Sequence, residues 1–242
     1  MNTLAVILAR KGSVGLPNKH LLPLLGRPVI GYTFEHAKAA RTLKKVVVST
    51  DCPEVQKLAR QAKLTVVDRP AALATGDASV QDVMLHAMDA AERDGTFTAD
   101  ALVVLYGNVP IRGDGTIDAC VRLLAGSLCD SVRTFCPVGK WHPAWMSKFG
   151  SDDRVTALEP GSVHRRQDLP QLWLHDGACV AVSRASMLRG RTWPNDPHAF
   201  FGTDRRGVKT DPGETVEIDH RRDLYWAEAV LRDRQGTLRK AS

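Results

Sequence analysis

The sequence predicts an α/β fold: a mostly parallel, twisted, Rossmann-like sheet flanked by helices. Through the first half of the chain, short apolar segments alternate with segments whose apolar residues recur at helical spacing. The apolar segments are hydrophobic on both faces, which is typical of parallel strands buried between helices. The 242 residues can bury a substantial core, and we expect one domain over residues 1–242.

The expected strands of the first half are apolar and β-branched: residues 4–9, 45–50, 64–67 and 101–105. The expected helices between them combine helical apolar spacing with start signals, Pro28 in a first turn and Ser79 as an N-cap: residues 28–37, 54–62, 79–92 and 116–124. Further strands at 178–183 and 215–218 and a closing helix at 224–234 complete the expected domain.

The region at about 138–172 has a different character. It is irregular and rich in Pro, Gly, Asp and Trp, and it contains Trp141-His142-Pro143-Ala144-Trp145. We expect an inserted hairpin or arm there, and its aromatic residues suit an interface between subunits. An intramolecular flap is the alternative.

Composition narrows the classes of function. The net charge is +6, but Lys and Arg form no tail and no aromatic residues interleave with a basic stripe, which disfavours a nucleic-acid partner. The charge suits an enzyme whose substrates are anions. The five cysteines contain no C-x-x-C pair, so we expect free thiols. The apolar run at 4–9 is too short for a signal peptide, and we expect a cytoplasmic protein without a membrane span.

The first expected strand runs directly into a loop that suits phosphate. Gly12 allows close approach of the backbone, and Ser13 adds an N–H donor beside it. Arg10, Lys11 and Lys19 can neutralise phosphate charge. The loop therefore predicts a nucleoside triphosphate site, with a tight turn carrying solvated charges as the alternative.

A pair of carboxylates late in the chain suits a divalent cation. Glu217 and Asp219 stand two residues apart on an expected strand, so their side chains point to the same face. Mg²⁺ prefers one or two carboxylates together with phosphate oxygens and water. We expect Glu217 and Asp219 to hold Mg²⁺, with a solvated acidic face as the alternative. Asp51, at the end of another expected strand, is a further candidate for a metal or ribose contact.

These motifs occur in the order found in sugar-activating cytidylyltransferases, and the chain especially resembles the N-acylneuraminate cytidylyltransferase family. The resemblance begins with Leu8-Ala9-Arg10-Lys11-Gly12-Ser13-Val14-Gly15-Leu16-Pro17-Asn18-Lys19-His20. Later elements similar to the family are Val48-Ser49-Thr50-Asp51, Arg69-Pro70, Asp77-Ala78-Ser79, Arg166-Gln167-Asp168-Leu169-Pro170, Asp176-Gly177-Ala178 and Glu214-Thr215-Val216-Glu217-Ile218-Asp219.

The resemblance implies transfer of CMP from CTP to an acidic 2-keto sugar of the sialic-acid type, with release of pyrophosphate. It implies catalytic roles for Arg10, Lys19 and Asp219. The nucleotide-binding residues that it implies are Leu8, Ala9, Arg10, Gly12, Ser13, Lys19, Arg69 and Ser79. The sugar-binding residues are Tyr106, Asn108, Arg112, Arg166, Asp176, Phe200 and Phe201. Simpler alternatives are a helix cap for Ser79 and core packing for both phenylalanines. The resemblance also implies a homodimer in which each arm reaches over the neighbouring site.

The chain departs from the family near the expected sugar site. The family usually has Leu-Gln-Pro-Thr-Ser-Pro-Leu-Arg after the central strand, whereas this chain has Leu105-Tyr106-Gly107-Asn108-Val109-Pro110-Ile111-Arg112. Asp176 stands where an Asn is usual, and Glu217 where an Asp is usual. Two alternative functions therefore stay open: a 3-deoxy-octulosonate cytidylyltransferase, and a non-catalytic nucleotide-binding module.

Overall fold

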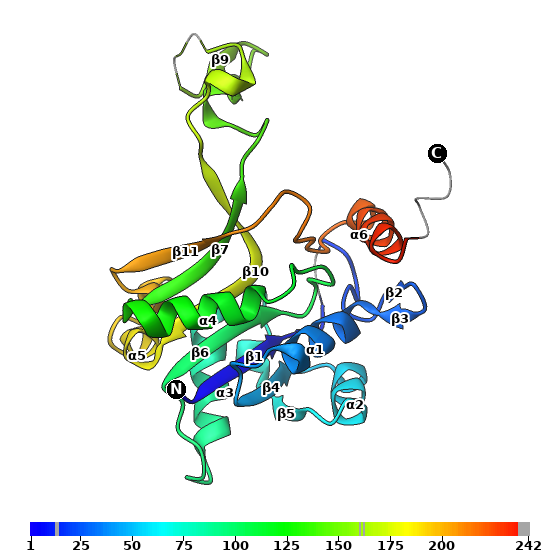
Figure 1. Ribbon diagram of the computed structural model, residues 1–242, viewed down its shortest axis with the longest axis vertical. Helices are drawn as coiled ribbons and strands as arrows, with labels where there is room; N and C mark the ends of the chain where they lie inside the picture. Colours follow the sequence, from blue (N-terminus) through cyan, green and yellow to red (C-terminus); the bar gives the residue numbers. More distant parts are fainter. Residues whose placement is uncertain (13–14, 160, 162, 237–242) are drawn as a thin grey trace.

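A sheet of seven strands organises the part of the chain that the computed structural model describes, residues 1–12, 15–159, 161 and 163–236. The strand order is β11-β7-β10-β6-β1-β4-β5 (Figure 1). Four strands pair in parallel, as the sequence predicts: β1 (Thr3–Leu8), β4 (Lys45–Thr50), β5 (Thr65–Asp68) and β6 (Ala101–Tyr106). A hairpin of β2 (Pro23–Leu24) and β3 (Arg27–Pro28) lies outside this sheet.

Helices cover both faces of the sheet and give it two apolar cores (Figure 1). One face carries α1 (Val29–Ala39), α2 (Pro53–Gln61) and α4 (Thr116–Ser127). The other carries α3 (Val80–Glu92) and α5 (Arg184–Thr192).

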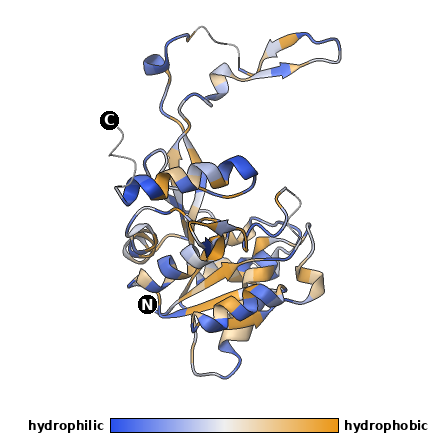
Figure 2. Cartoon of the chain, turned by 90° about the vertical axis from the view of Figure 1, so that its right-hand side faces the viewer, coloured by the Kyte–Doolittle hydropathy of each residue, from blue (hydrophilic) through white to orange (hydrophobic). Residues whose placement is uncertain are grey.

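The two cores follow from the alternation of side chains along each strand. In β1, Ala5 and Ile7 join the core under α1, whereas Leu4 and Val6 join the core under α3. Figure 2 shows the same concentration of hydrophobic residues in the central strands. These cores confirm the predicted α/β fold.

The second half of the chain adds antiparallel pairing. β10 (Trp173–Ser183) pairs antiparallel with β6 and with β7 (Ser131–Pro137), and β11 (Arg205–Lys209) runs parallel to β7. The register of β10 shifts between His175 and Val180, which marks a bulge. The expected strand at 178–183 lies within β10.

The strand predicted at 215–218 is wrong as a sheet element. Its backbone forms one isolated bridge, between Val216 and Ile111. Val216 and Ile218 are nevertheless buried, in a third apolar cluster that includes Ala227 of α6 (Arg221–Arg234). Side chains along the segment alternate between buried and exposed, as in a strand, but the buried ones pack beside α6 instead of against a neighbouring strand.

Residues between β7 and β10 project away from the sheet as the sequence led us to expect (Figure 1). The projection carries a small hairpin of β8 (Ser147–Phe149) and β9 (Val155–Ala157). Trp141 and Phe149 on it are 67% and 77% exposed. No helix in the described residues is long and apolar enough to cross a membrane.

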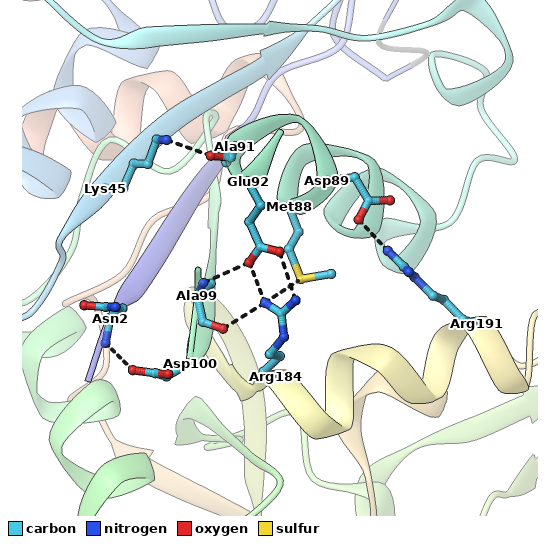
Figure 3. A network of polar contacts seen from close by, with 10 residues as sticks. All are labelled: Asn2, Lys45, Met88, Asp89, Ala91, Glu92, Ala99, Asp100, Arg184 and Arg191. Atoms are coloured by element: carbon cyan, nitrogen blue, oxygen red, sulfur yellow. Dashed lines mark hydrogen bonds and ion pairs between the residues drawn. The ribbon is translucent and has the colours of Figure 1, made fainter. Parts of the chain in front are cut away.

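A charged network joins the end of α3 to the start of α5 (Figure 3). Arg184 forms a two-point contact with the Glu92 carboxylate and also donates to the Ala99 carbonyl oxygen at 3.0 Å. Glu92 in turn accepts from the Ala99 N–H at 2.8 Å. The hydrogen bond from Arg184 lowers the pKa of Glu92.

We expect Glu92→Gln to lower the free energy of unfolding by about 1.5 kcal/mol near neutral pH, because it removes a charge-assisted pair. The folded-state pKa of Glu92 lies below its ordinary value of 4.5, so this stability is present above that pH and is lost as the pH falls through the folded pKa. Urea unfolding at neutral and acidic pH measures both effects.

Asp89→Asn is the matched control. Asp89 pairs with Arg191 nearby (Figure 3), but both side chains are more than half exposed, so we expect a change within about 0.5 kcal/mol. Equal losses for the two variants would contradict the prediction.

Candidate active site

A cavity of about 500 Å³ lies at the carboxyl ends of β1 and β6, where ligands bind in parallel α/β sheets. The segment after residue 216 forms part of its wall, so the first and last parts of the chain meet there. The lining includes these residues singled out in the sequence: Leu8, Arg10, Lys19, Arg69, Tyr106, Asn108, Glu217 and Asp219.

Local hydrogen bonds shape the loop after β1. Arg10 donates to the Gly12 carbonyl oxygen at 3.0 Å, and Gly12 has a φ of +75°, which favours glycine. The Lys11 N–H donates to Asp51 Oδ1 at 2.7 Å, so Asp51 holds the loop. Ala9 is buried beneath it. Ser13 lies outside the described residues.

The two predicted metal ligands converge on one amide group. Asn108 Nδ2 lies 3.1 Å from Glu217 Oε1 and 3.4 Å from Asp219 Oδ1, and it also donates to the Ile218 carbonyl oxygen. Lys19 Nζ lies 2.6 Å from Asp219 Oδ1. Burial raises the pKa of Glu217, and the negative charge of Asp219 raises it further.

This carboxylate pair fits a divalent cation. Two acidic side chains brought together in this way repel one another, and a bound cation relieves that repulsion. The described residues contain no group of three or more His, Cys, Asp or Glu side chains that could hold a metal ion. Two carboxylates are enough for Mg²⁺, which takes its other ligands from water and substrate oxygens, so Mg²⁺ at Glu217 and Asp219 stays a prediction.

Positive charge lines another wall of the cavity. Arg69 is buried and donates to the Ser49 carbonyl oxygen at 2.7 Å, and burial lowers its pKa to about 10. His20 is also buried, and burial together with the charges of Lys19 and Arg69 lowers its pKa to about 3. His20 is therefore a neutral polar group at ordinary pH. Sequence reasoning did not single it out, although it directly follows Lys19.

Ser79 caps α3, as the simpler interpretation predicted. Its hydroxyl oxygen accepts from the Asp82 N–H at 3.0 Å, and the hydroxyl lies 2.7 Å from the Asp82 carboxylate. Its neighbours Ala78 and Val80 line the cavity. A contact between Ser79 and a nucleotide stays a prediction.

Arg112 is misassigned by the sequence as a sugar contact. Its side chain is fully buried and lines no part of the cavity beside Tyr106. The guanidinium donates to the carbonyl oxygens of Ala178, Tyr106 and Val109 at 2.8, 2.9 and 2.5 Å. Burial lowers its pKa to about 10. Arg112 therefore holds the backbone that presents Tyr106 and Asn108.

Asp176 is also a structural group instead of a free sugar contact. Its two oxygens accept from the hydroxyls of Thr134, Thr210 and Thr215 and from the Ala178 N–H. Burial by itself would raise the pKa of Asp176, but these hydrogen bonds lower it overall. The carboxylate thereby fixes the bulge of β10 against the segment after β11.

Phe200 and Phe201 belong to the core, as the simpler interpretation predicted. Both are less than 10% exposed, and their ring centroids lie 4.2 Å apart in the core shared with α3 and α5. The expectation that they line a sugar pocket is therefore wrong for this chain on its own. Arg166 lies on the projecting segment, beside a separate cavity of about 240 Å³.

Comparison with known proteins places these features in context. A family model described as cytidylyltransferase matches residues 4–122. An N-acylneuraminate cytidylyltransferase of Streptococcus agalactiae serotype V is 27% identical over 227 residues, which cover 93% of this chain and 52% of that protein. A 3-deoxy-manno-octulosonate cytidylyltransferase of Bdellovibrio bacteriovorus is 38% identical over 127 residues, 51% of this chain and 46% of that protein. The chain thus matches about half the length of each relative.

The fold has a solved counterpart. The structure of a CMP:2-keto-3-deoxy-manno-octonic acid synthetase complexed with CTP superposes with a TM-score of 0.73. The superposition covers 97% of this chain and 100% of the synthetase chain. The sequence identity is 18%, so the likeness concerns the fold.

We expect Arg112→Ala to lower the free energy of unfolding by about 3 kcal/mol or more, because it leaves buried carbonyl oxygens without donors and opens a void. Arg122→Ala, an exposed position on α4, is the matched control and should change stability by less than about 0.5 kcal/mol. Urea unfolding measures both, and a loss below about 1 kcal/mol for Arg112→Ala would show that the guanidinium is dispensable.

Proposed function

We propose that this chain, a relative of the N-acylneuraminate cytidylyltransferases, transfers CMP from CTP to the anomeric hydroxyl of an acidic 2-keto sugar and releases pyrophosphate. One observation carries the proposal. Arg10 and Lys19 face the same cavity as the Glu217–Asp219 pair, so cations for a triphosphate and carboxylates for a metal ion share one space. The names of the matched cytidylyltransferases agree with this chemistry.

The loop after β1 would bind the triphosphate. A nucleoside triphosphate carries about four negative charges near neutral pH, and Arg10 and Lys19 offset part of them by charge-assisted hydrogen bonds. Gly12 and Ser13 would add backbone donors. Leu8, Ala9 and Arg69 would form the floor beneath the nucleoside. Fixed positive charge near the leaving pyrophosphate stabilises the transition state because it requires no reorganisation during the reaction.

Glu217 and Asp219 would hold Mg²⁺, which supplies neutralisation of phosphate charge and lowers the pKa of a bound hydroxyl. Lys19 Nζ lies 2.6 Å from Asp219 Oδ1, and the Lys19 side chain is only 17% exposed. When a cation occupies Asp219, we infer that Lys19 turns to a phosphate oxygen. Asn108 would keep the two carboxylates together in both situations.

We further infer that residues 1–242 act as one domain whose arm, at about 138–172, contacts a second copy. The arm exposes Trp141 and Phe149, and exposed aromatic residues are enriched at interfaces. Arg166 lies away from the cavity of its own chain, so it reaches a sugar site only in such a homodimer.

A 3-deoxy-octulosonate acceptor is the second candidate. The Bdellovibrio relative favours it, whereas the Arg166-Gln167 motif favours a nine-carbon acid. Both acids share the 2-keto carboxylate, so the same nucleotide site serves either.

Pyrophosphate release from CTP with N-acetylneuraminate and with 3-deoxy-manno-octulosonate tests the activity. We expect turnover with one of them, and none after chelation of divalent cations. We expect Asp219→Asn to lower kcat by about 100-fold, because it removes a carboxylate from the metal site. Asp211→Asn, exposed and outside the cavity, is the control.

Retained CTP binding without pyrophosphate release from either acid would instead indicate a non-catalytic nucleotide-binding module. Near-normal turnover of Asp219→Asn at saturating Mg²⁺ would contradict the metal assignment. Equilibrium sedimentation separately tests the dimer, and a monomer at micromolar concentration would remove it.

A further inference from the structure

The residues that the sequence singled out for the sugar place no cation in the candidate active-site cavity of the same chain. Arg112 is fully buried, and Arg166 lies beside a different cavity. Asp176 repels a carboxylate. Another arginine contacts one of the core phenylalanines. The Arg133 guanidinium carbon lies 4.6 Å from the centroid of the Phe201 ring.

Strand register places Arg133 on the face of the sheet that carries the candidate active site. Arg133 of β7 is opposite Val180 of β10. Its neighbour Val132 packs into the core under α4, so Arg133 points to the opposite face, toward α3 and Phe201. The cavity lining also includes side chains of α3.

Arg133 has aromatic and cationic neighbours but no acidic partner. Its guanidinium lies 5.3 Å from the Phe135 ring centroid as well as over Phe201, and Arg205 lies 5.7 Å from the same Phe201 ring. Within the described part of the chain, neither arginine forms an ion pair with Asp or Glu. Burial lowers the pKa of Arg133, and the charge of Arg205 lowers it further. Arg133 is partly buried and Arg205 is exposed, and an anion bound between the two cations would relieve their repulsion.

Tyr106 lies between Arg133 and the candidate active-site cavity along the sheet. Burial and the charge of Glu217 raise the pKa of Tyr106, while the charge of Arg133 opposes them. Val180, opposite Arg133, is also opposite Val104 of β6, so Arg133 stands level with Val104. Tyr106 follows two residues farther along β6 on the same face of the sheet, and it lines the cavity together with Glu217. An acceptor that passes Tyr106 can contact both Arg133 and the carboxylate pair.

We propose that Arg133, supported by Arg205, binds the carboxylate of the acidic sugar, an inference that rests on the proposed transfer to a 2-keto sugar acid. In such an acid the carboxylate is bonded to the anomeric carbon. A carboxylate held by the guanidinium therefore directs the anomeric hydroxyl past Tyr106 toward the Glu217–Asp219 pair. Guanidinium suits this task because its planar donors pair with a carboxylate at two points. Arg133 thereby selects acidic over neutral sugars.

The test compares Arg133→Ala and Arg133→Lys with wild type, using the better of N-acetylneuraminate and 3-deoxy-manno-octulosonate and the carboxamide of the same sugar. We expect Arg133→Ala to raise KM for the acid at least tenfold, to leave KM for CTP within about twofold, and to abolish the preference for acid over amide. Arg133→Lys should keep part of the preference, since it keeps the charge but loses the two-point geometry.

Arg206→Ala is the matched control. Arg206 follows Arg205 on β11 and pairs with Asp204 on the surface, so we expect kinetics close to wild type. Thermal unfolding and CTP binding by calorimetry confirm that each variant is folded. A preference for acid over amide that survives in folded Arg133→Ala would overturn the proposal.

Binding measurements distinguish a failure of the carboxylate site from a failure of the proposed transferase activity. Calorimetric binding of the two sugar acids, with CTP and Mg²⁺ present, is measured alongside turnover. Absence of turnover together with binding that Arg133→Ala weakens would reject the transferase and support the carboxylate site. Turnover or binding that is insensitive to Arg133→Ala would reject the carboxylate site alone.

Discussion

The buried guanidinium of Arg112 is the constraint on which the rest of the candidate site depends. It joins the end of β6 to β10 through the carbonyl oxygens of Tyr106 and Ala178, and it also donates to Thr33 of α1 at 3.0 Å. A buried cation without a carboxylate partner is costly, and here backbone carbonyl oxygens offset that cost. The sharp path of residues 106–109 is thereby held, and Asn108 reaches across to the last carboxylates.

Opposite charges from distant parts of the chain share one cavity. Lys19 pairs with Asp219, which joins the first loop to the last extended segment, and Gly15 lets their backbones approach. A side chain at Gly15 would begin 3.1 Å from the Asp219 carbonyl oxygen. Glu217 stays beside Asn108 at 3.1 Å, where a cation is favourable. In the proposed function, one half of the site would bind phosphate and the other half would bind the metal ion.

Much of the architecture could be predicted because it follows from local patterns. Continuous apolar runs define β1 and β6, and Ser79 starts α3 by its own hydroxyl. The segment at 215–218 shows the limit of such patterns. Alternation predicted its buried and exposed sides, but alternation does not specify whether the next neighbour is a strand or the helix α6.

What the sequence by itself determined is the order of strands and helices, the cationic loop, and the spacing that places Glu217 and Asp219 on one side. These depend on residues close together in the chain. Only the tertiary structure decided that Arg112, Asp176 and the two phenylalanines are internal, because burial depends on which distant backbone covers a side chain. For the same reason it brought Arg133 toward Tyr106: β10, which follows both of their strands in the sequence, lies between β7 and β6 in the sheet, and local patterns do not specify that arrangement.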